Sequence, residues 1–302
     1  MRVLVIGNGF DLDLGLPTRY KDFIHSEESD CLTRWKDMPA ECLAFHLTKC
    51  SEGQWFDIEE AMAEYVEVRE MNNDYSSVIK EIDECILKEL KDGFWNYVAN
   101  KLMDIGNNSW EKHVKDSMAK NIIEMQNRTK CFDKIYSFNC FDYFYCDLAS
   151  NQELECLNYV NYIHGTGPDF ILGIGEDDCK SDMLSFLKKT NQKGYQHEII
   201  SQFKSNLMKA DEVFIFGHSL NRIDMMYFRE MLWNIYLYQN KAKRITIITK
   251  NVNTAEQIKE NISNHAPILF EKLCSSCQLI FLYTDKYINS KRIDNIEDLV
   301  NI

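Results

Sequence analysis

The chain lacks most of the features that would place it in a specialised structural class. Only four of its 302 residues are proline, and no repeat or low-complexity tract interrupts it, so we expect no extended linker. No segment approaches the roughly 18 uninterrupted apolar residues of a membrane span. An apolar strand pattern begins at residue 3, which leaves no room for a signal peptide. We therefore expect a cytoplasmic protein with no membrane partner.

Basic residues are also scarce relative to acidic ones. The chain has 34 Lys and Arg against 47 Asp and Glu, a net charge of −13. Such a charge repels phosphate backbones, and the basic clusters at 188–189 and 241–244 are short, so no nucleic acid partner is expected. Apolar residues make up 45% of the chain, which is ample for one large domain or two small ones.

The eleven cysteines do not form a disulfide or metal-binding framework. Their number is odd and their spacing irregular, so we expect reduced thiols. Cys274 and Cys277 form the only Cys-x-x-Cys, and a zinc site there would need a second ligand pair, which is missing. We therefore expect no bound metal. Five histidines in helical or loop patterns are expected to be surface or core residues without partners: His25, His46, His113, His197 and His265.

Strand and helix patterns alternate over much of the chain. Apolar runs of buried-strand length occur at 3–6, 134–139, 159–164, 212–217, 244–249 and 278–282. Helical patterns follow at 201–209, 223–238 and 253–264. Continuous apolar strands that alternate with helices predict a parallel sheet with helices on both faces, which is an α/β Rossmann-like fold.

The segment 18–130 breaks this alternation, because its patterns are helical throughout, with Ile58, Met62 and Tyr65 on one face of the first long helix. The strand at 3–6 must then join the later sheet, and we expect it to lie beside the strand at 134–138. We predict a nucleotide-binding domain of residues 1–17 plus 131–302, interrupted by an all-helical insertion of residues 18–130.

Gly7, Asn8 and Gly9 directly follow the first strand. A glycine turn between a parallel strand and a helix suits a pyrophosphate, because N–H groups and the helix dipole point into the crevice there. The two glycines would let a ligand approach the backbone. Position 12 is Leu12, so the generic Gly-x-Gly-x-x-Gly fingerprint is incomplete. The plainer alternative is a turn without a ligand.

Polar residues follow the other strands as well. Ligands of open parallel sheets bind at the carboxyl ends of the strands, so we expect these residues to converge on one pocket. The candidates are Asn139 and Asp142 after the second strand, His164 and Gly165 after the third, and Gly217, His218, Ser219 and Asp224 after the fourth, together with Phe10 and Asp11 after the first.

Two family resemblances are carried by these motifs. Gly7-x-Gly9, followed after five residues by Gly15-Leu-Pro, resembles the nucleotide-binding loop of the sirtuin family at identical spacing. The run from Asn8 to Phe23, Asn-Gly-Phe-Asp-Leu-x-x-Gly-Leu-Pro-Thr-x-Tyr-x-Asp-Phe, is similar to the opening of the bacterial abortive-infection AbiH family. Together they imply a sirtuin-like domain in an anti-phage protein.

The sirtuin resemblance also implies site roles. Asn139 would orient the nicotinamide ribose or an attacking water, His164 would be the catalytic histidine, and Gly217-His-Ser219 would hold the adenosine ribose. The family's Asp stands two residues after its Asn, where this chain has Phe141, and Asp142 comes one residue later. The two Cys pairs of zinc-containing sirtuin deacylases are absent, which argues against a protein deacylase.

The resemblance implies NAD as the substrate, cleaved to nicotinamide and ADP-ribose. Asn139 and His164 would be the catalytic residues, because a pure binding site needs neither a base nor an orienting amide. An NAD or ADP-ribose sensor without turnover remains the alternative, and a toxin with another target is a third. A homo-oligomer or a phage-derived trigger would be the further partner.

Overall fold

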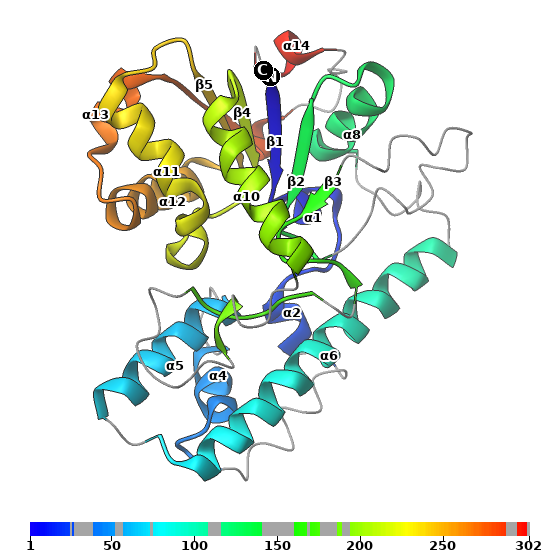
Figure 1. The fold of residues 1–302 in the computed structure, drawn as a ribbon. Coiled ribbons are helices and arrows are strands. Elements are labelled where there is room, and N and C mark those ends of the chain that lie inside the picture. The colour runs from blue at the N-terminus through cyan, green and yellow to red at the C-terminus, as the bar shows by residue number, and fades with distance from the viewer. Residues whose placement is uncertain are drawn as a thin grey trace. The chain divides into compact units, whose positions relative to one another are not determined.

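The computed structural model describes residues 1–24, 26, 39–51, 57–72, 75–107, 116–140, 160–167, 170–175, 186–188, 194–287 and 295–300. Contacts divide the chain into two compact units (Figure 1). The first, here called the sheet unit, comprises Met1–Leu16, Ile105–His164 and Gly194–Ile302. The second, the helical unit, comprises Pro17–Asp104 and Gly165–Lys193.

The sheet unit is built on six parallel strands in the order β3-β2-β1-β4-β5-β6. Their bounds are β1 Arg2–Ile6, β2 Lys134–Ser137, β3 Val160–Tyr162, β4 Glu212–Phe216, β5 Arg244–Thr249 and β6 Gln278–Tyr283. The predicted α/β fold is confirmed, and so is the pairing of residues 3–6 with the strand that begins at residue 134. This is a doubly wound order, and its direction reverses between β1 and β4, the place where such sheets bind ligands.

Helices cover both faces of this sheet. On one face Val5 and Ile215 pack in a core with Phe203 of α10 (Gly194–Lys209) and Phe228 of α11 (Arg222–Tyr238). The same core receives α12 (Val252–His265) and α13 (Phe270–Ser276). The opposite face holds α1 (Asn8–Leu14), whose Phe10 ring lies 5.0 Å from that of Phe216. The short elements η7 (Thr284–Lys286) and α14 (Ile296–Val300) follow β6.

The helix α8 (Met118–Thr129) clusters with the sheet unit, whereas the sequence analysis placed it in the helical insertion. The backbone N–H of Ala119 donates to the Asp13 carboxylate at 2.8 Å, which ties α8 to α1. The helical unit in turn includes residues 165–193, which the sequence analysis assigned to the nucleotide-binding domain. Helical periodicity shows that a segment buries one face, but not which neighbour covers it.

The helical unit contains α2 (Tyr20–Ile24), α4 (Leu43–Ser51), α5 (Ile58–Asn72) and most of α6 (Ser77–Asn107). No strand occurs among the described residues of 18–130, as predicted. The expected core face of α5 is confirmed, because Ile58, Met62 and Tyr65 are all buried.

A buried carboxylate joins three helices of this unit. Asp83 of α6 accepts hydrogen bonds from the backbone N–H of Leu43 at 2.8 Å and from the Tyr65 hydroxyl at 2.6 Å. Burial raises the pKa of Asp83, and it raises that of the Tyr65 hydroxyl as well. Because buried polar groups are costly without partners, these bonds favour one arrangement of α4, α5 and α6.

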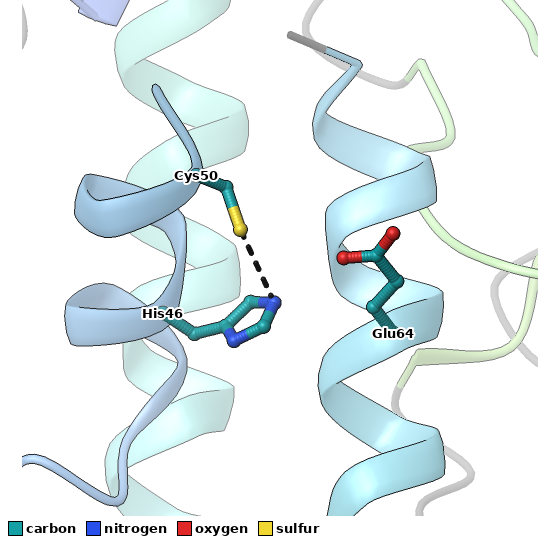
Figure 2. A group of neighbouring side chains, drawn as sticks. All are labelled: His46, Cys50 and Glu64. Atoms are coloured by element: carbon teal, nitrogen blue, oxygen red, sulfur yellow. Dashed lines mark hydrogen bonds between the residues drawn. The ribbon is translucent and has the colours of Figure 1, made fainter. Parts of the chain in front are cut away.

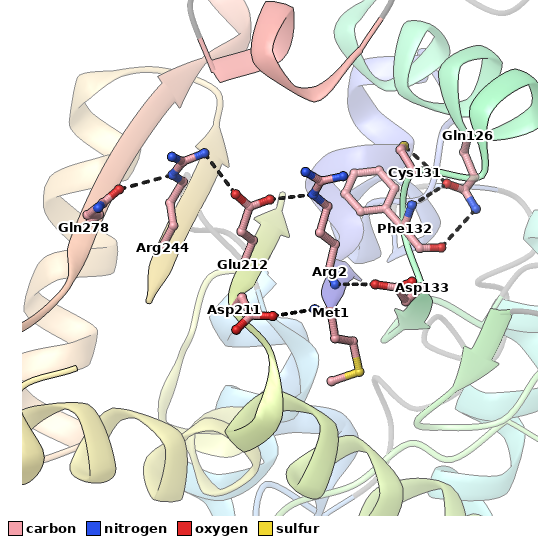
Figure 3. A network of polar contacts seen from close by, with 10 residues as sticks. All are labelled: Met1, Arg2, Gln126, Cys131, Phe132, Asp133, Asp211, Glu212, Arg244 and Gln278. Atoms are coloured by element: carbon pink, nitrogen blue, oxygen red, sulfur yellow. Dashed lines mark hydrogen bonds and ion pairs between the residues drawn. The ribbon is translucent and has the colours of Figure 1, made fainter. Parts of the chain in front are cut away.

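A ladder of polar side chains crosses the amino edge of the sheet (Figure 3). Glu212 at the start of β4 accepts from Arg2 Nε at 2.6 Å and from Arg244 at 3.0 Å, and Arg244 Nε donates to Gln278 at 3.3 Å. These four residues are direct cross-strand partners. The ladder therefore matches the register of β1, β4, β5 and β6, although exposed pairs contribute little energy each.

Among the residues that the structure describes, no helix is both long and apolar enough to cross a lipid bilayer.

The buried side chain of Lys243 caps the carboxyl end of α10. Lys243 Nζ donates to the carbonyl oxygens of Leu207 at 2.7 Å, Met208 at 3.2 Å and Ala210 at 2.7 Å. We expect Lys243→Met to lower the free energy of unfolding by about 2–4 kcal/mol, because it leaves these carbonyls without a charged donor. Urea unfolding measures the loss, with Lys241→Met at an exposed neighbouring position as control. Equal stability of the two variants would contradict this role.

Candidate functional site

Five buried polar side chains lie beyond the carboxyl ends of neighbouring strands in the sheet unit. They are Asp11, Asn139, His164, His218 and Asp224, and their exposed fractions are 1%, 7%, 6%, 5% and 8%. Contacts among them come in two groups, one around Asn139 and one around Asp224. Both groups consist of residues selected from the sequence, and each group brings together side chains from different strand ends.

Asn139 joins the turn after β2 to the turn after β1. Its position is set locally by Ser137, whose hydroxyl accepts the Asn139 backbone N–H at 3.1 Å. Its side-chain Nδ2 donates to the Gly7 carbonyl at 3.1 Å and to Asp11 Oδ1 at 2.8 Å. Because an amide nitrogen carries only two hydrogens, Asn139 can contact a ligand only as an acceptor, through Oδ1.

Asp224 lies between two imidazoles. His164 Nε2 is 3.6 Å from Asp224 Oδ1, and His218 Nε2 is 3.5 Å from Asp224 Oδ2. Asp224 is held in the first turn of α11, where its backbone N–H donates to the capping side chain of Asn221 at 3.1 Å. The two carboxylate oxygens of Asp224 thus each face one imidazole nitrogen.

The hydrogen bonding of His218 distinguishes it from His164. The backbone N–H of Leu220 donates to His218 Nδ1 at 3.0 Å, so Nδ1 is an acceptor and the proton of the neutral ring is on Nε2, which faces Asp224. Both ring nitrogens of His218 are therefore engaged within the protein. This engagement argues against His218 as a base, the role for which the sequence resemblance names His164.

Phe138 is a member of this cluster that the sequence analysis did not select. Its ring centroid is 5.3 Å from that of His164 and 4.4 Å from that of His218, both nearly perpendicular. It also stacks on Phe228 at 5.6 Å. Phe138 could have been selected because it directly precedes Asn139 at the end of a strand. An aromatic residue in a strand is, however, usually interpreted as part of the hydrophobic core.

Gly7 and Gly9, which were expected to face a ligand, pack against the backbone of the turn after β4. Gly9 N–H donates to the Gly217 carbonyl at 2.8 Å, and Gly7 N–H donates to that of Phe216 at 2.9 Å. A Cβ on Gly9 would lie 2.6 Å from Gly217 Cα. Backbone atoms therefore fill the space beside Gly9 that was expected to hold the phosphates of a ligand. Gly9→Val would disturb this backbone packing as well as any ligand binding.

Gly217 has the same tight surrounding from the other side. Its φ is 66°, and a Cβ there would lie 2.3 Å from the Phe10 backbone nitrogen. The turns after β1 and β4 are therefore packed backbone against backbone at the switch point of the sheet. Both turns need glycine for this approach.

The remaining predicted residues have varied positions. Asn8 begins α1, and Gly15 ends it with φ 88°. Phe10 is fully buried against the sheet. The Ser219 carbonyl accepts from Asn261 at 2.9 Å. Gly165, with φ 75°, is the first residue of a segment that belongs to the helical unit. Asp142 lies outside the described residues, as do His25 and His113.

The arrangement places imidazoles beside a carboxylate and, in the other group, an amide oxygen that can accept a hydrogen bond. Burying charged or titratable groups generally costs stability, and groups of them occur preferentially at functional sites. The Asp224 cluster therefore has the composition of a site for proton transfer.

Comparison with known proteins gives one match. The family model described as bacteriophage abortive infection AbiH matches residues 3–249. This range begins within β1 and ends with β5, so it contains every member of the candidate site. No curated protein and no solved structure matches the chain.

Proposed function

Since this chain belongs to the bacteriophage abortive infection AbiH family and its role is therefore in anti-phage defence, we propose that it hydrolyses NAD to nicotinamide and ADP-ribose. Loss of NAD would stop the metabolism of the infected cell before the phage completes its replication. The proposal places the chain in the cytoplasm, with a phage-derived trigger or self-association as the means of activation.

The observation that carries this proposal is the Asp224 carboxylate between His164 and His218, which like the Asn139–Asp11 pair lies beyond the carboxyl ends of the strands around the switch point of the sheet. Sheets of this strand order bind dinucleotides at that point. The resemblance to the sirtuin Asn and His-Gly motifs supports NAD as the dinucleotide. We infer no metal in this reaction, because the site residues supply the base and the orienting group.

The reaction breaks the bond between nicotinamide and the ribose carbon. Nicotinamide leaves as a neutral molecule, and water adds to the oxocarbenium-like ribose carbon and loses a proton. His164 would accept this proton, and Asp224 would stabilise the imidazolium. Asn139 Oδ1 would accept a hydrogen bond from the water or a ribose hydroxyl, which holds it in position for attack. The products are nicotinamide, ADP-ribose and one proton.

The alternative is a sensor that binds NAD or ADP-ribose without turnover. The low exposure of His164 and Asp224 favours it, since a buried base meets water less readily. Purified full-length protein incubated with NAD, with and without an extract of phage-infected cells as a source of the trigger, separates the two, because nicotinamide is released only by hydrolysis, whereas a change in melting temperature reports binding alone.

We expect Asn139→Ala to reduce nicotinamide release by about 100-fold, the size of effect that follows when a reacting group is misplaced by about 1 Å. Liquid chromatography of the products measures it, and Asn253→Ala, at an exposed position of α12, is the control. The melting temperature of each variant shows whether folding is retained. Full activity of a folded Asn139→Ala variant would remove Asn139 from the mechanism.

A further inference from the structure

A second group of reactive side chains lies in the helical unit. His46 and Cys50 are four residues apart on α4, and Glu64 stands on the neighbouring helix α5 with its carboxylate toward them (Figure 2). One ligand atom from each of the three lies within 4.8 Å of the other two. Side chains at positions i and i+4 share one face of a helix, so the pair on α4 faces α5 as a unit.

The separation within the pair matches a known coordination geometry. Cys50 Sγ and His46 Nε2 are 3.4 Å apart. Tetrahedral zinc with typical bond lengths to sulfur and nitrogen would place these two atoms roughly 3.6 Å apart. The two side chains are therefore already spaced as ligands of one ion, and no backbone movement is needed. Glu64 is exposed, so its carboxylate can close the remaining distance by side-chain rotation.

We propose that His46, Cys50 and Glu64 bind one zinc ion, with the fourth coordination position open to water. A thiolate and an imidazole favour zinc over magnesium or calcium, which prefer oxygen ligands. The thiolate and the carboxylate together balance the two charges of the ion. Three protein ligands and one water form the usual composition of an accessible zinc site.

The surroundings of the group are suited to such an ion. His46 and Cys50 are half-buried between α4 and α5, and the His46 ring lies 5.6 Å from that of Tyr65. Burial lowers the pKa of His46. Lys49 and Arg69 are the nearby cations that act on this imidazole, and Glu64 opposes them from α5.

This group was not predicted from the sequence. No metal was expected, because Cys274 and Cys277 had no second ligand pair, and His46 was expected to have no partner. The second expectation is wrong, because Cys50 lies beside His46. The spacing His-x-x-x-Cys in a helical pattern was the available signal, but the third ligand comes from another helix and cannot be found by spacing alone.

Metal titration of the purified full-length protein tests the proposal. Protein stripped by a chelator is titrated with zinc against a metal indicator, and separately with cobalt, whose thiolate complexes absorb in the near ultraviolet. We expect one equivalent to bind with a thiolate-to-cobalt band. Cys50→Ser should abolish that band and weaken zinc binding by more than about 100-fold, the upper limit for loss of an outer-sphere partner.

Matched variants separate this site from others. Cys85→Ser changes an exposed cysteine of α6 and should leave binding unchanged, whereas Glu64→Gln and His46→Ala should weaken it. Circular dichroism shows that each variant is folded. The proposal is overturned if no zinc binds stoichiometrically, if the cobalt band persists in Cys50→Ser, or if binding is lost instead in Cys274→Ser.

Discussion

Replacing His164 with alanine is expected to reduce nicotinamide release from NAD by about 10²–10⁴-fold, the usual cost of removing a general base. His164 Nε2 lies 3.6 Å from Asp224 Oδ1, so Asp224 is placed to stabilise the imidazolium that forms when His164 accepts a proton. The measurement is the rate of nicotinamide formation by purified protein at saturating NAD, because removal of a base lowers the rate of the chemical step.

The matched control is His197→Ala, which removes an exposed histidine from α10 in the same unit. It should keep the wild-type rate. Since His164 is itself buried and contacts the Phe138 ring, His164→Gln is a second variant that keeps more of the side-chain volume. Wild-type turnover by a folded His164→Gln or His164→Ala protein would show that another group is the base.

Replacing Gly217 with alanine is expected to lower the free energy of unfolding by about 3–5 kcal/mol, in the range of severe backbone and packing defects. The added Cβ would lie 2.3 Å from the Phe10 nitrogen, and the φ of 66° is strained for a residue with a side chain. Backbone atoms cannot move aside as a flexible side chain can, so the turns after β1 and β4 must separate.

Gly194→Ala is the control for this prediction, because a Cβ at Gly194 meets nothing within 4 Å. Its stability should be unchanged or slightly higher, since alanine favours the helix α10 that begins there. Urea unfolding of both variants gives the comparison. A Gly217→Ala protein as stable as Gly194→Ala would mean that the two turns are not packed as described.

Much of the sheet was predictable from residue patterns. Runs such as Glu212–Gly217 and Arg244–Thr249 are apolar, β-branched and of strand length, and they form β4 and β5. Because ligands bind at the carboxyl ends of parallel strands, Asn139, His164 and Asp224 could be selected from the sequence. These predictions depend on local pattern and on general topology, which a sequence contains.

The parts that were not predictable depend on which segments pack together. The close approach of Gly9 and Gly217 joins residues 208 positions apart in the chain, and no local pattern indicates it. The placement of Asp224 between two histidines depends on where α11 begins above the sheet. The group of His46, Cys50 and Glu64 requires the pairing of α4 with α5.

The most direct measurement is the NAD content of phage-infected cells that express the wild-type chain or the His164→Ala variant. Infection supplies the trigger that the protein needs. The result therefore does not depend on whether the purified protein is active without that trigger. The account predicts that NAD falls and nicotinamide rises after infection in wild-type cells, and that both stay constant with His164→Ala, which should also lose protection. Protection by the wild-type chain with NAD unchanged would contradict the proposal that it acts by NAD hydrolysis.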